Sequence, residues 1–502
     1  MKNILLAFCF CFSVSNYAQY TSIPDLNFEK KLISLGIDSG NPDQRVLTSS
    51  IAGITSLAVD NSNISDLTGI QDFIALKELY CYYNSLESLD LSKNTNLTTL
   101  QCYNNNLTSL NLSTNISLSY LDCSRNNLTT LNTATNNELK KLQCVSNKLT
   151  SIVLPLNGEL EELLCHGNSL AALDVSKSVK LKNLSCYTNN LSSLDISANI
   201  LLNRLDCSKN QLTVLNISNN KQLDYLVTAT NKLKNLDVTG CEALTYLACA
   251  SNELSGLDVS HNLLLKSLSC SSNQIVSLDI SKNDKLETLL CNFNKLTTLD
   301  FQNNNSLINV MLTNNQVTVL DVSKMLKLNR LECSDNLLIS LDLSQNKVLE
   351  FLKCENNKLT SLNLKNTNNA KIAYSYPNYP NFKNNPDLTC ILVDSQSYSG
   401  TNWDSKKDVS MSYSESCTLG TADLLFEKTI VYPNPSRGLL NIRNALLDKI
   451  TVYNMLGQLQ KSVVILNNEE NHVIDLSQLS KGAYFIVLEK DNKPLRRKII
   501  IN

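Results

Sequence analysis

The sequence predicts a mainly β protein: a solenoid of about 14–15 coils with little helix, a small N-terminal helical cap and a C-terminal all-β sandwich domain. Three observations support this fold class. A 21-residue pattern repeats without insertion from Cys81 to Cys354. Each copy alternates apolar and polar residues over short stretches, which favours strands over helices. The C-terminal region consists of alternating segments separated by turn residues.

Residues 1–19 have the layout of a secretory signal peptide, with a lysine, an apolar run (Ile4 to Val14) and a small-residue exit near Ala18. The run is too short to span a bilayer, and no later segment has about 18 uninterrupted apolar residues, so we expect no transmembrane segment in the mature chain. The net charge is −2, with no long run of either sign, which argues against nucleic acid as a partner.

Residues 20–53 are expected to form an N-terminal cap, because an open coil would expose its core leucines. The segment from Ile23 to Asp38 places apolar residues at helical spacing behind Pro24 and Asp25. This pattern predicts one amphipathic helix with Asp25 near its start.

The solenoid is expected over residues 54–366, with the consensus Leu-x-x-Leu-x-Cys-x-x-Asn-x-Leu-x-x-Leu-Asp-Leu-Ser-x-Asn-x-x. In each coil, Leu-x-x-Leu-x-Cys should form a short parallel strand with leucine and cysteine inside. The Leu-Asp-Leu-Ser segment repeats the alternation and often has β-branched residues in its inward slot, so we expect strand-like structure on both faces.

An asparagine follows three residues after the cysteine slot in all 14 copies, from Asn84 to Asn357. A side-chain amide both donates and accepts, so a stacked row can bond the turn backbone of the coils above and below. Each turn amide left buried and unpaired would cost about 1–3 kcal/mol. We interpret this row as structural.

The cysteine slot also accepts Thr228 and Leu312, so it requires a small or apolar inward side chain. Stacked strands would hold neighbouring sulfurs about 4.8 Å apart, whereas disulfides prefer a Cβ separation near 3.8 Å. We therefore expect buried thiols. A ladder of disulfides and an array of metal ions are the alternatives, and no Cys-x-x-Cys or Cys/His spacing supports the latter.

This 21-residue pattern resembles the leucine-rich repeat family, in particular its short bacterial class, over about Ile54 to Asn366. The sequence departs from the pattern at Val153, Pro155 and Cys241. The resemblance implies a scaffold that binds partners through its strand face.

After the repeats, residues 367–423 lose the period and are expected to form a C-terminal cap. Cys390 and Cys417 frame a segment that contains the only tryptophan, Trp403. In an oxidising compartment two such cysteines are a good disulfide candidate, and we predict that they pair.

Residues 424–502 contain the segments "VYPNPSRGLLNI", "ITVYNMLGQLQKS" and "LSKGAYFIVLEKDNKPLRRKIIIN". Together they resemble the type A sorting domain of the type IX secretion system of Bacteroidetes. The resemblance implies type IX secretion machinery as a partner, removal of the domain after export, and a protein that is secreted, extracellular or attached to the outer surface of a Gram-negative cell. The residues on the family motifs are Pro433, Asn434, Pro435, Gly438, Gly457, Gly482 and Tyr484. Plain turn chemistry would also explain these prolines and glycines.

The sequence indicates no catalytic residues, no cofactor and no metal site. The three histidines, His166, His261 and His472, share no motif, and no hydrolase, phosphate-binding or calcium-loop pattern is present. The Asp of each Leu-Asp-Leu-Ser segment recurs once per coil, which suggests a turn residue. A hydrolase within residues 367–423 is disfavoured because that segment has no histidine.

We therefore predict a non-catalytic recognition or adhesion scaffold that binds a protein or glycan through its concave strand face; the alternative is a structural surface-layer or biofilm component without a specific ligand. Tyrosine offers contact area and a hydroxyl at low entropic cost. The candidate binding residues on the solvent-facing slots are Tyr80, Tyr82, Tyr83, Tyr103, Tyr120, Leu290, Phe293 and Met311. These side chains could equally tile a solvated face without binding anything. The slots between the two groups, such as Val227, Ala229, Ala248 and Ala250, are small and are expected to be bland.

Overall fold

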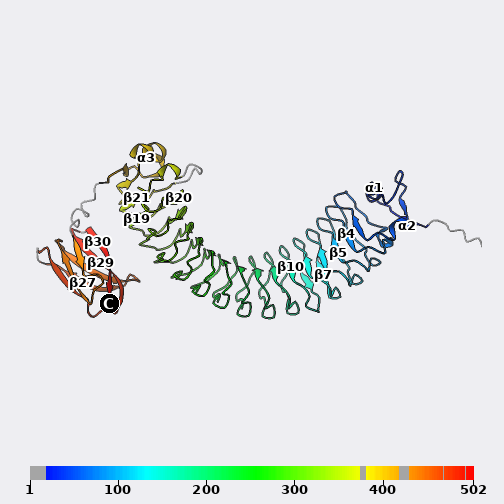
Figure 1. Cartoon of the computed structure of the whole chain (residues 1–502), viewed down its shortest axis with the longest axis horizontal. Coiled ribbons are helices and arrows are strands. Elements are labelled where there is room, and N and C mark those ends of the chain that lie inside the picture. The colour runs from blue at the N-terminus through cyan, green and yellow to red at the C-terminus, as the bar shows by residue number, and fades with distance from the viewer. Residues whose placement is uncertain (1–18, 373–379, 418–428, 467–468, 492) are drawn as a thin grey trace, which may run out of the picture. The chain divides into compact units, whose positions relative to one another are not determined.

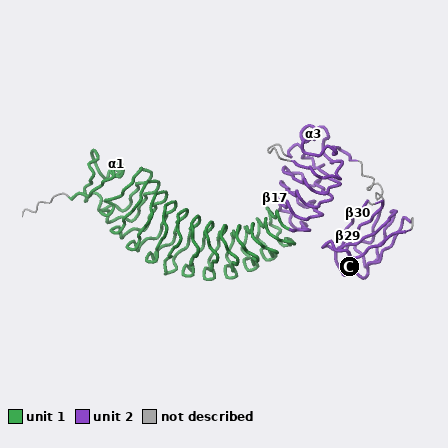
Figure 2. The backbone as a smooth tube through the Cα atoms, turned by 180° about the vertical axis from the view of Figure 1, so that it is seen from behind, with its two compact units in different colours: residues 1–294 green, residues 295–502 purple. Residues whose placement is uncertain are grey.

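The computed structural model describes residues 19–372, 380–417, 429–466, 469–491 and 493–502 (Figure 1). Apart from Gln19, the predicted signal peptide lies outside these ranges. The chain divides into two compact units, residues 1–294 and 295–502, which are described separately (Figure 2). The fold is a mainly β solenoid of about 17 coils, and 6% of the chain is helical. The predicted fold class is confirmed, although coils form before and after the regular repeats and raise their number above 14–15.

The N-terminal cap contains the predicted helix α1 (Leu26–Ser34), a short helix α2 (Thr48–Ile51) and an antiparallel pair, β1 (Tyr20–Ser22) and β2 (Arg45–Leu47). Asp25 caps α1, because its Oδ1 accepts hydrogen bonds from the backbone N–H groups of Asn27 and Phe28. Its Oδ2 accepts a bond from Ser65 N at 2.8 Å, which ties the helix to the first coils.

Strands of three residues form one parallel ladder through the first unit. In chain order they are β3 (Ser56–Ala58), β4 (Glu78–Tyr80), β5 (Thr99–Gln101), β6 (Tyr120–Asp122), β8 (Lys141–Gln143), β10 (Glu162–Leu164), β11 (Asn183–Ser185), β12 (Arg204–Asp206), β13 (Tyr225–Val227), β14 (Tyr246–Ala248), β15 (Ser267–Ser269) and β16 (Thr288–Leu290). The register is one-to-one between equivalent positions, as in Leu79↔Leu100. The central leucine of each strand is buried and its two flanking residues face outward. A 3-10 turn, η1 (Ile70–Asp72), completes the first coils.

The opposite side of the coils differs from the prediction. Within the first unit the Leu-Asp-Leu-Ser segments pair as strands only at β7 (Thr130–Asn132) and β9 (Ser151–Val153). Elsewhere their backbone N–H groups bond within the coil: Ser92 N donates to Asp90 Oδ1, and Asn94 N donates to Leu91 O. The link to the next coil is a side-chain amide, since Asn115 Nδ2 donates to Leu91 O at 3.1 Å. The expectation of strand structure on both faces is therefore wrong for most coils, since pairing on one side already fixes the stacking.

The asparagine row is present and buried. Asn105 Nδ2 donates to Cys81 O at 2.9 Å in the preceding coil and to Cys102 O at 3.1 Å in its own, while its Oδ1 accepts from Leu86 N at 3.0 Å. Each amide thus bonds its own coil and the one before it. Stacked in a row, the amides therefore connect each turn to the next, as expected from the sequence.

The ladder cysteines are free thiols and all of those described are buried. Burial raises the pKa of the Cys81 thiol to about 12, so it is not a nucleophile near neutral pH. Cys241, in a second row otherwise occupied mostly by asparagine, donates its thiol to Asn220 O at 3.7 Å. The sulfurs act as small apolar packing groups and weak donors.

In the second unit the strand face continues as β17 (Asn309–Met311), β18 (Arg330–Glu332) and β20 (Phe351–Lys353). A second parallel ladder contains β19 (Ser340–Asp342), β21 (Ser361–Asn363), β22 (Cys390–Leu392) and β23 (Ser412–Ser414). The remaining short elements are η2 (Asn369–Lys371), α3 (Gln396–Asn402) and η3 (Asp404–Lys406).

The asparagine row extends beyond the regular repeats. Asn385 Nδ2 donates to Cys354 O at 3.1 Å, and its Oδ1 accepts from Leu359 N at 3.1 Å. Cys390 and Cys417 are joined by a disulfide with a Cα–Cα distance of 5.9 Å. Trp403 is 2% exposed and its ring contacts Phe382, Tyr398 and Tyr413.

The C-terminal domain is a sandwich of two antiparallel sheets. One contains β24 (Ile430–Tyr432), β25 (Leu439–Arg443) and β28 (His472–Asp475), and the other contains β27 (Leu459–Val464), β26 (Lys449–Asn454), β29 (Gly482–Lys490) and β30 (Lys493–Ile501). Leu440, Ile450 and Ile486 are among the residues of its separate core. Across the described ranges, no helix combines the length and the apolar character needed to cross a membrane.

Candidate recognition face

Tyr82, Tyr83 and Tyr103, here called the tyrosine cluster, lie on the strand face of the first coils. The rings of Tyr82 and Tyr103 stack with centroids 4.5 Å apart and an interplanar angle of 5°. Tyr83 packs edge-on against both, at 5.9 Å from Tyr82 and 5.5 Å from Tyr103. The stacking follows from the repeat, because Tyr82 and Tyr103 occupy the same slot of adjacent coils. Tyr83 is 52% exposed and has a positive φ of 52°, which directs the chain into the turn that follows the strand.

Carboxylates surround this part of the face. Tyr80 donates its hydroxyl to Glu78 at 3.3 Å, and burial together with the negative charge of Glu78 raises the tyrosine pKa. The charge of Asp60 raises the pKa of Tyr82. Tyr120 opens β6, two residues before Asp122, and burial followed by the charge of Asp122 raises its pKa. Tyr80, Tyr82 and Tyr120 therefore remain protonated donors at neutral pH.

Asp122 is set into the face and is 8% exposed. Burial raises its pKa, although a hydrogen bond from Ser124 N to Oδ1 at 3.0 Å and the positive charge of Arg125 act in the opposite direction.

The apolar candidates do not form one group. Leu290 ends β16 and is half-buried, whereas Phe293 follows in the same coil and is 56% exposed. Met311 ends β17 in the second unit, which is described by itself. The structure thus assembles the tyrosine cluster but does not join it to a single apolar patch.

Two further ring stacks were missed by the sequence reasoning. His166 and Tyr187 stack at 4.1 Å with an interplanar angle of 14°. Tyr225 and Tyr246 stack at 4.6 Å, and the Arg204 guanidinium lies 4.3 Å from the centroid of Tyr225. The expectation of a bland middle region is therefore wrong, because it overlooked Tyr225 and Tyr246, which precede the leucine of their strands. His166 and Tyr187 instead follow the cysteine, in the slot that Tyr82 and Tyr103 occupy. The signal was available, since rings that are one repeat apart in the sequence occupy equivalent slots.

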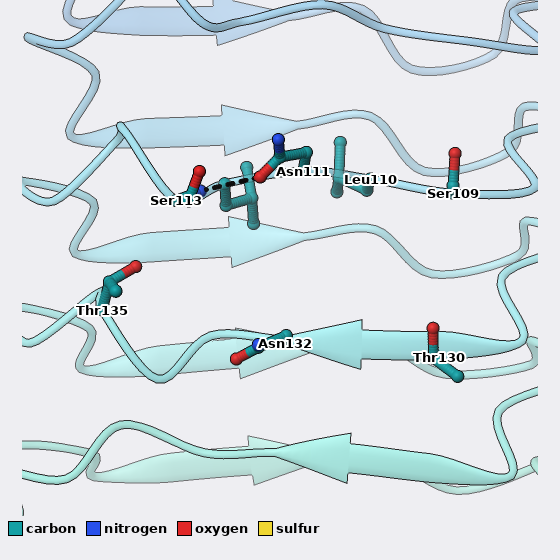
Figure 3. Close-up of a pocket in the computed structure, with 8 residues that line it drawn as sticks. Ser109, Leu110, Asn111, Ser113, Thr130, Asn132 and Thr135 are labelled. Carbon is teal, nitrogen blue, oxygen red and sulfur yellow. Dashed lines mark hydrogen bonds between the residues drawn. The ribbon is translucent and has the colours of Figure 1, made fainter.

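A small polar hollow lies on the other side of the coils (Figure 3). Ser109, Leu110 and Asn111 border it from one coil, and Thr130 and Asn132 from the next. Asn111 accepts a hydrogen bond from Ser113 N at 3.1 Å, so its carbonyl serves its own turn. None of the residues that line this hollow carries a charge.

The recurrent aspartates act as turn residues, as predicted. Asp195 Oδ1 accepts a hydrogen bond from Ser197 N at 2.9 Å, and Asp279 accepts one from Ser281 N at 2.9 Å. Bonds of this kind lower the pKa of both carboxyl groups. Within the described ranges, no three His, Cys, Asp or Glu residues come together in a group that could hold a metal ion.

The residues on the sorting motifs lie in the C-terminal domain. Asn434 Nδ2 donates to Lys498 O and its Oδ1 accepts from Ile500 N, so the loop between β24 and β25 is bonded to β30. Gly438 has a φ of +109°, and a Cβ there would lie 2.6 Å from Ser477 Cα, so only glycine fits. The Tyr484 hydroxyl donates to Ser480 O at 2.7 Å. Pro433 and Pro435 flank Asn434, Gly457 follows β26 in the turn to β27, and Gly482 opens β29.

Comparison with known proteins separates the two parts of the chain. Residues 430–502 match the family model described as a secretion system C-terminal sorting domain. A 45-residue stretch is 49% identical to Internalin J of Listeria monocytogenes serotype 4b (strain F2365), which is 9% of this chain and 5% of that protein.

Two solved structures extend the likeness. The functional domain of InlJ from Listeria monocytogenes, described as including a cysteine ladder, aligns with a TM-score of 0.67 and 28% identity over 96% of this chain and 98% of that one. YopM from Yersinia enterocolitica WA-314 aligns with a TM-score of 0.50 and 27% identity over 61% of this chain and 70% of that one. With the repeat geometry and the terminal sandwich, these matches show a leucine-rich repeat solenoid, similar to internalins, that carries a type IX C-terminal sorting domain.

Proposed function

We propose that this protein is a non-catalytic recognition or adhesion scaffold that binds a protein or glycan through its strand face after export by the type IX secretion machinery. The observation that carries the proposal is the tyrosine cluster: three rings in mutual contact on adjacent coils, one of them 52% exposed. Rigid aromatic side chains that are already packed lose little entropy when a partner covers them.

The surroundings of the cluster support binding over mere solvation. Glu78 and Asp60 supply acceptors next to the hydroxyl donors of Tyr80 and Tyr82. A partner could therefore bury apolar ring area and still satisfy the polar groups at the edge of the contact, which is the usual composition of a specific interface.

Export follows from the sorting domain, and attachment to the outer surface of a Gram-negative cell is part of the proposal. Mass spectrometry of the protein recovered from cells tests its fate. Peptides beyond about residue 424 should be missing from the surface form if the domain is removed after passage. Their persistence would contradict removal.

The decisive experiment is a screen of the exported chain on protein and glycan arrays, with the triple variant Tyr80→Ser, Tyr82→Ser, Tyr103→Ser. We expect specific capture by the wild type and a loss of at least tenfold in the variant. The melting temperature should stay within a few degrees, because these side chains are only half-buried and lie outside the leucine core. The matched control is Tyr225→Ser with Tyr246→Ser, a stacked pair elsewhere on the same face. Unchanged capture by the triple variant would eliminate the cluster, and self-association without any captured partner would favour a structural surface component.

A further inference from the structure

The strand face contains the same local arrangement twice, four coils apart. The stretches "DCSRNNL" from Asp122 and "DCSKNQL" from Asp206 occupy the same position of their repeats. In each case a stacked pair of rings occupies the two preceding coils: Tyr82 with Tyr103, and His166 with Tyr187. The rings occupy the slot directly after the cysteine of each repeat. No other pair of coils in residues 78–294 combines stacked rings in that slot with an Asp-Cys-Ser sequence in the next coil.

In both arrangements the next coil has no aromatic ring to continue the stack, and the last ring, Tyr103 or Tyr187, is half-buried. The ring slot of the next coil is filled by a serine, Ser124 after Tyr103 and Ser208 after Tyr187. A serine is too small to cover an aromatic face. A flat group could therefore continue each stack, lying over the serine.

The carboxylate beside each serine is held in one orientation. Ser124 N donates to Asp122 Oδ1 at 3.0 Å, and Ser208 N donates to Asp206 Oδ1 at 3.0 Å. The Ser208 hydroxyl adds a second bond to Asp206 Oδ1 at 2.6 Å. Both carboxylates are set into the face, since Asp122 is only 8% exposed and Asp206 is half-buried.

A cationic residue stands three positions after each aspartate in the sequence, Arg125 after Asp122 and Lys209 after Asp206. Arg125 and Lys209 follow the serines, are exposed, and have nearly the same positive φ, 52° and 51°. Each arrangement thus offers an aromatic ring at the end of a stack, a fixed hydrogen-bond acceptor and a cationic donor. The cation disfavours a lysine- or arginine-rich peptide as the occupant, and the carboxylate disfavours an anion.

We propose that the two arrangements are equivalent subsites for the sugar rings of one glycan chain. A pyranose ring presents an apolar C–H face to an aromatic ring, and its hydroxyl groups both donate to a carboxylate and accept from a guanidinium or ammonium group. At a strand spacing of about 4.8 Å the subsites lie about 19 Å apart along the solenoid, so an extended oligosaccharide can occupy both. This inference deepens the proposed function and rests on it, since it names the ligand class and adds a second contact beyond the tyrosine cluster.

The test uses the full chain on an oligosaccharide array that spans glucans, galactans, N-acetylhexosamine polymers and mucin-type chains, beside a peptide array. Calorimetry then follows with a disaccharide fragment of the captured glycan. We expect two disaccharides per wild-type chain, one for Tyr103→Ala, one for Tyr187→Ala and none for the double variant. For the long glycan, each single variant should lose about a hundredfold in affinity, because bivalent attachment is lost.

Conservative variants and a matched control keep the test independent of folding. Asp122→Asn and Asp206→Asn preserve the shape of the side chain and should each weaken one subsite. Tyr246→Ala is the control: it removes a stacked ring, but the next coil has Ser269 where the subsites have an aspartate, so both subsites should stay intact. Capture of no oligosaccharide, or a stoichiometry that Tyr187→Ala does not change, would overturn the inference. Capture of peptides alone would overturn it as well and would leave the proposed function standing, whereas the absence of any captured partner would count against both.

Discussion

Replacing Asn189 with alanine should lower the free energy of unfolding by about 3 kcal/mol, while replacing the adjacent Asn190 should change it by less than about 0.5 kcal/mol. Asn189 belongs to the buried asparagine row and is 7% exposed, whereas the Asn190 side chain is exposed. The comparison isolates the row, because the two residues are chemically identical neighbours in one turn.

The magnitude follows from the partners of the Asn189 amide. Its Nδ2 donates to Cys165 O at 3.1 Å and to Cys186 O at 3.0 Å, and its Oδ1 accepts from Leu170 N at 3.0 Å. Both carbonyls keep a second donor, since the Asn168 and Asn210 amides also bond them. The Leu170 N–H, in contrast, loses its hydrogen-bond acceptor when Asn189 is replaced.

One buried N–H without an acceptor costs about 1–3 kcal/mol, and each lost bond to a carbonyl that remains paired costs roughly 0.5 kcal/mol. Alanine at position 190 retains the only bond of that residue that matters, from its backbone N to Leu170 O at 2.9 Å. The two substitutions should therefore differ several-fold in effect.

Urea unfolding with a comparison of m-values measures the stability change, and amide hydrogen exchange locates it. The Leu170 amide should exchange faster in Asn189→Ala than in the wild type, while amides several coils away stay protected. Equal midpoints for the two variants, or an unchanged Leu170 exchange rate, would refute the reasoning.

Two other predictions concern the ends of the solenoid. Burial by itself raises the pKa of Asp25, but hydrogen bonds from Ser65 and Phe28 outweigh it and lower that pKa below its usual value. The ionised Asp25 carboxylate therefore stabilises the fold above about pH 4, and this stabilisation is lost as the pH falls through the folded-state pKa. Asp25→Ala should lower the free energy of unfolding by about 3 kcal/mol at pH 7. It should also make stability, followed by circular dichroism, depend less on pH in the acid range. An unchanged dependence on pH would argue against this helix cap. Reducing the disulfide between Cys390 and Cys417, which are 27 residues apart, should destabilise the C-terminal coils by about 3.5 kcal/mol. Trp403 fluorescence reports that transition, and an identical midpoint with and without reductant would contradict it.

The repeat explains why so much could be predicted without coordinates. Each coil has the same neighbours as the next, so one inference about Leu100, Cys102 or Asn105 applies along the whole row. The strand side, the buried thiols and the turn role of Asp195 follow from that equivalence, and the helix after Asp25 follows from local capping chemistry.

Interactions between coils were less accessible to sequence reasoning. The Leu-Asp-Leu-Ser segments pair at β7 and β9, and at β19 and β21 in the second unit, but not in most coils, because their backbone N–H groups can bond within the turn. The asparagine row continues to Asn385, although the chain between Asn357 and Asn385 is longer than one repeat and the period is broken there.

The amino-acid sequence by itself determined the coil, its inward and outward slots and the C-terminal sorting domain, because periodicity, side-chain polarity and turn chemistry act over distances shorter than one repeat. Only the tertiary structure decided which outward slots cooperate. Rings that are one repeat apart in the sequence stack with centroid distances of 4.1 Å, 4.5 Å and 4.6 Å, and carboxylates are oriented beside them, as in Tyr187 and Asp206. They meet because stacking converts a long sequence separation into the spacing of neighbouring strands.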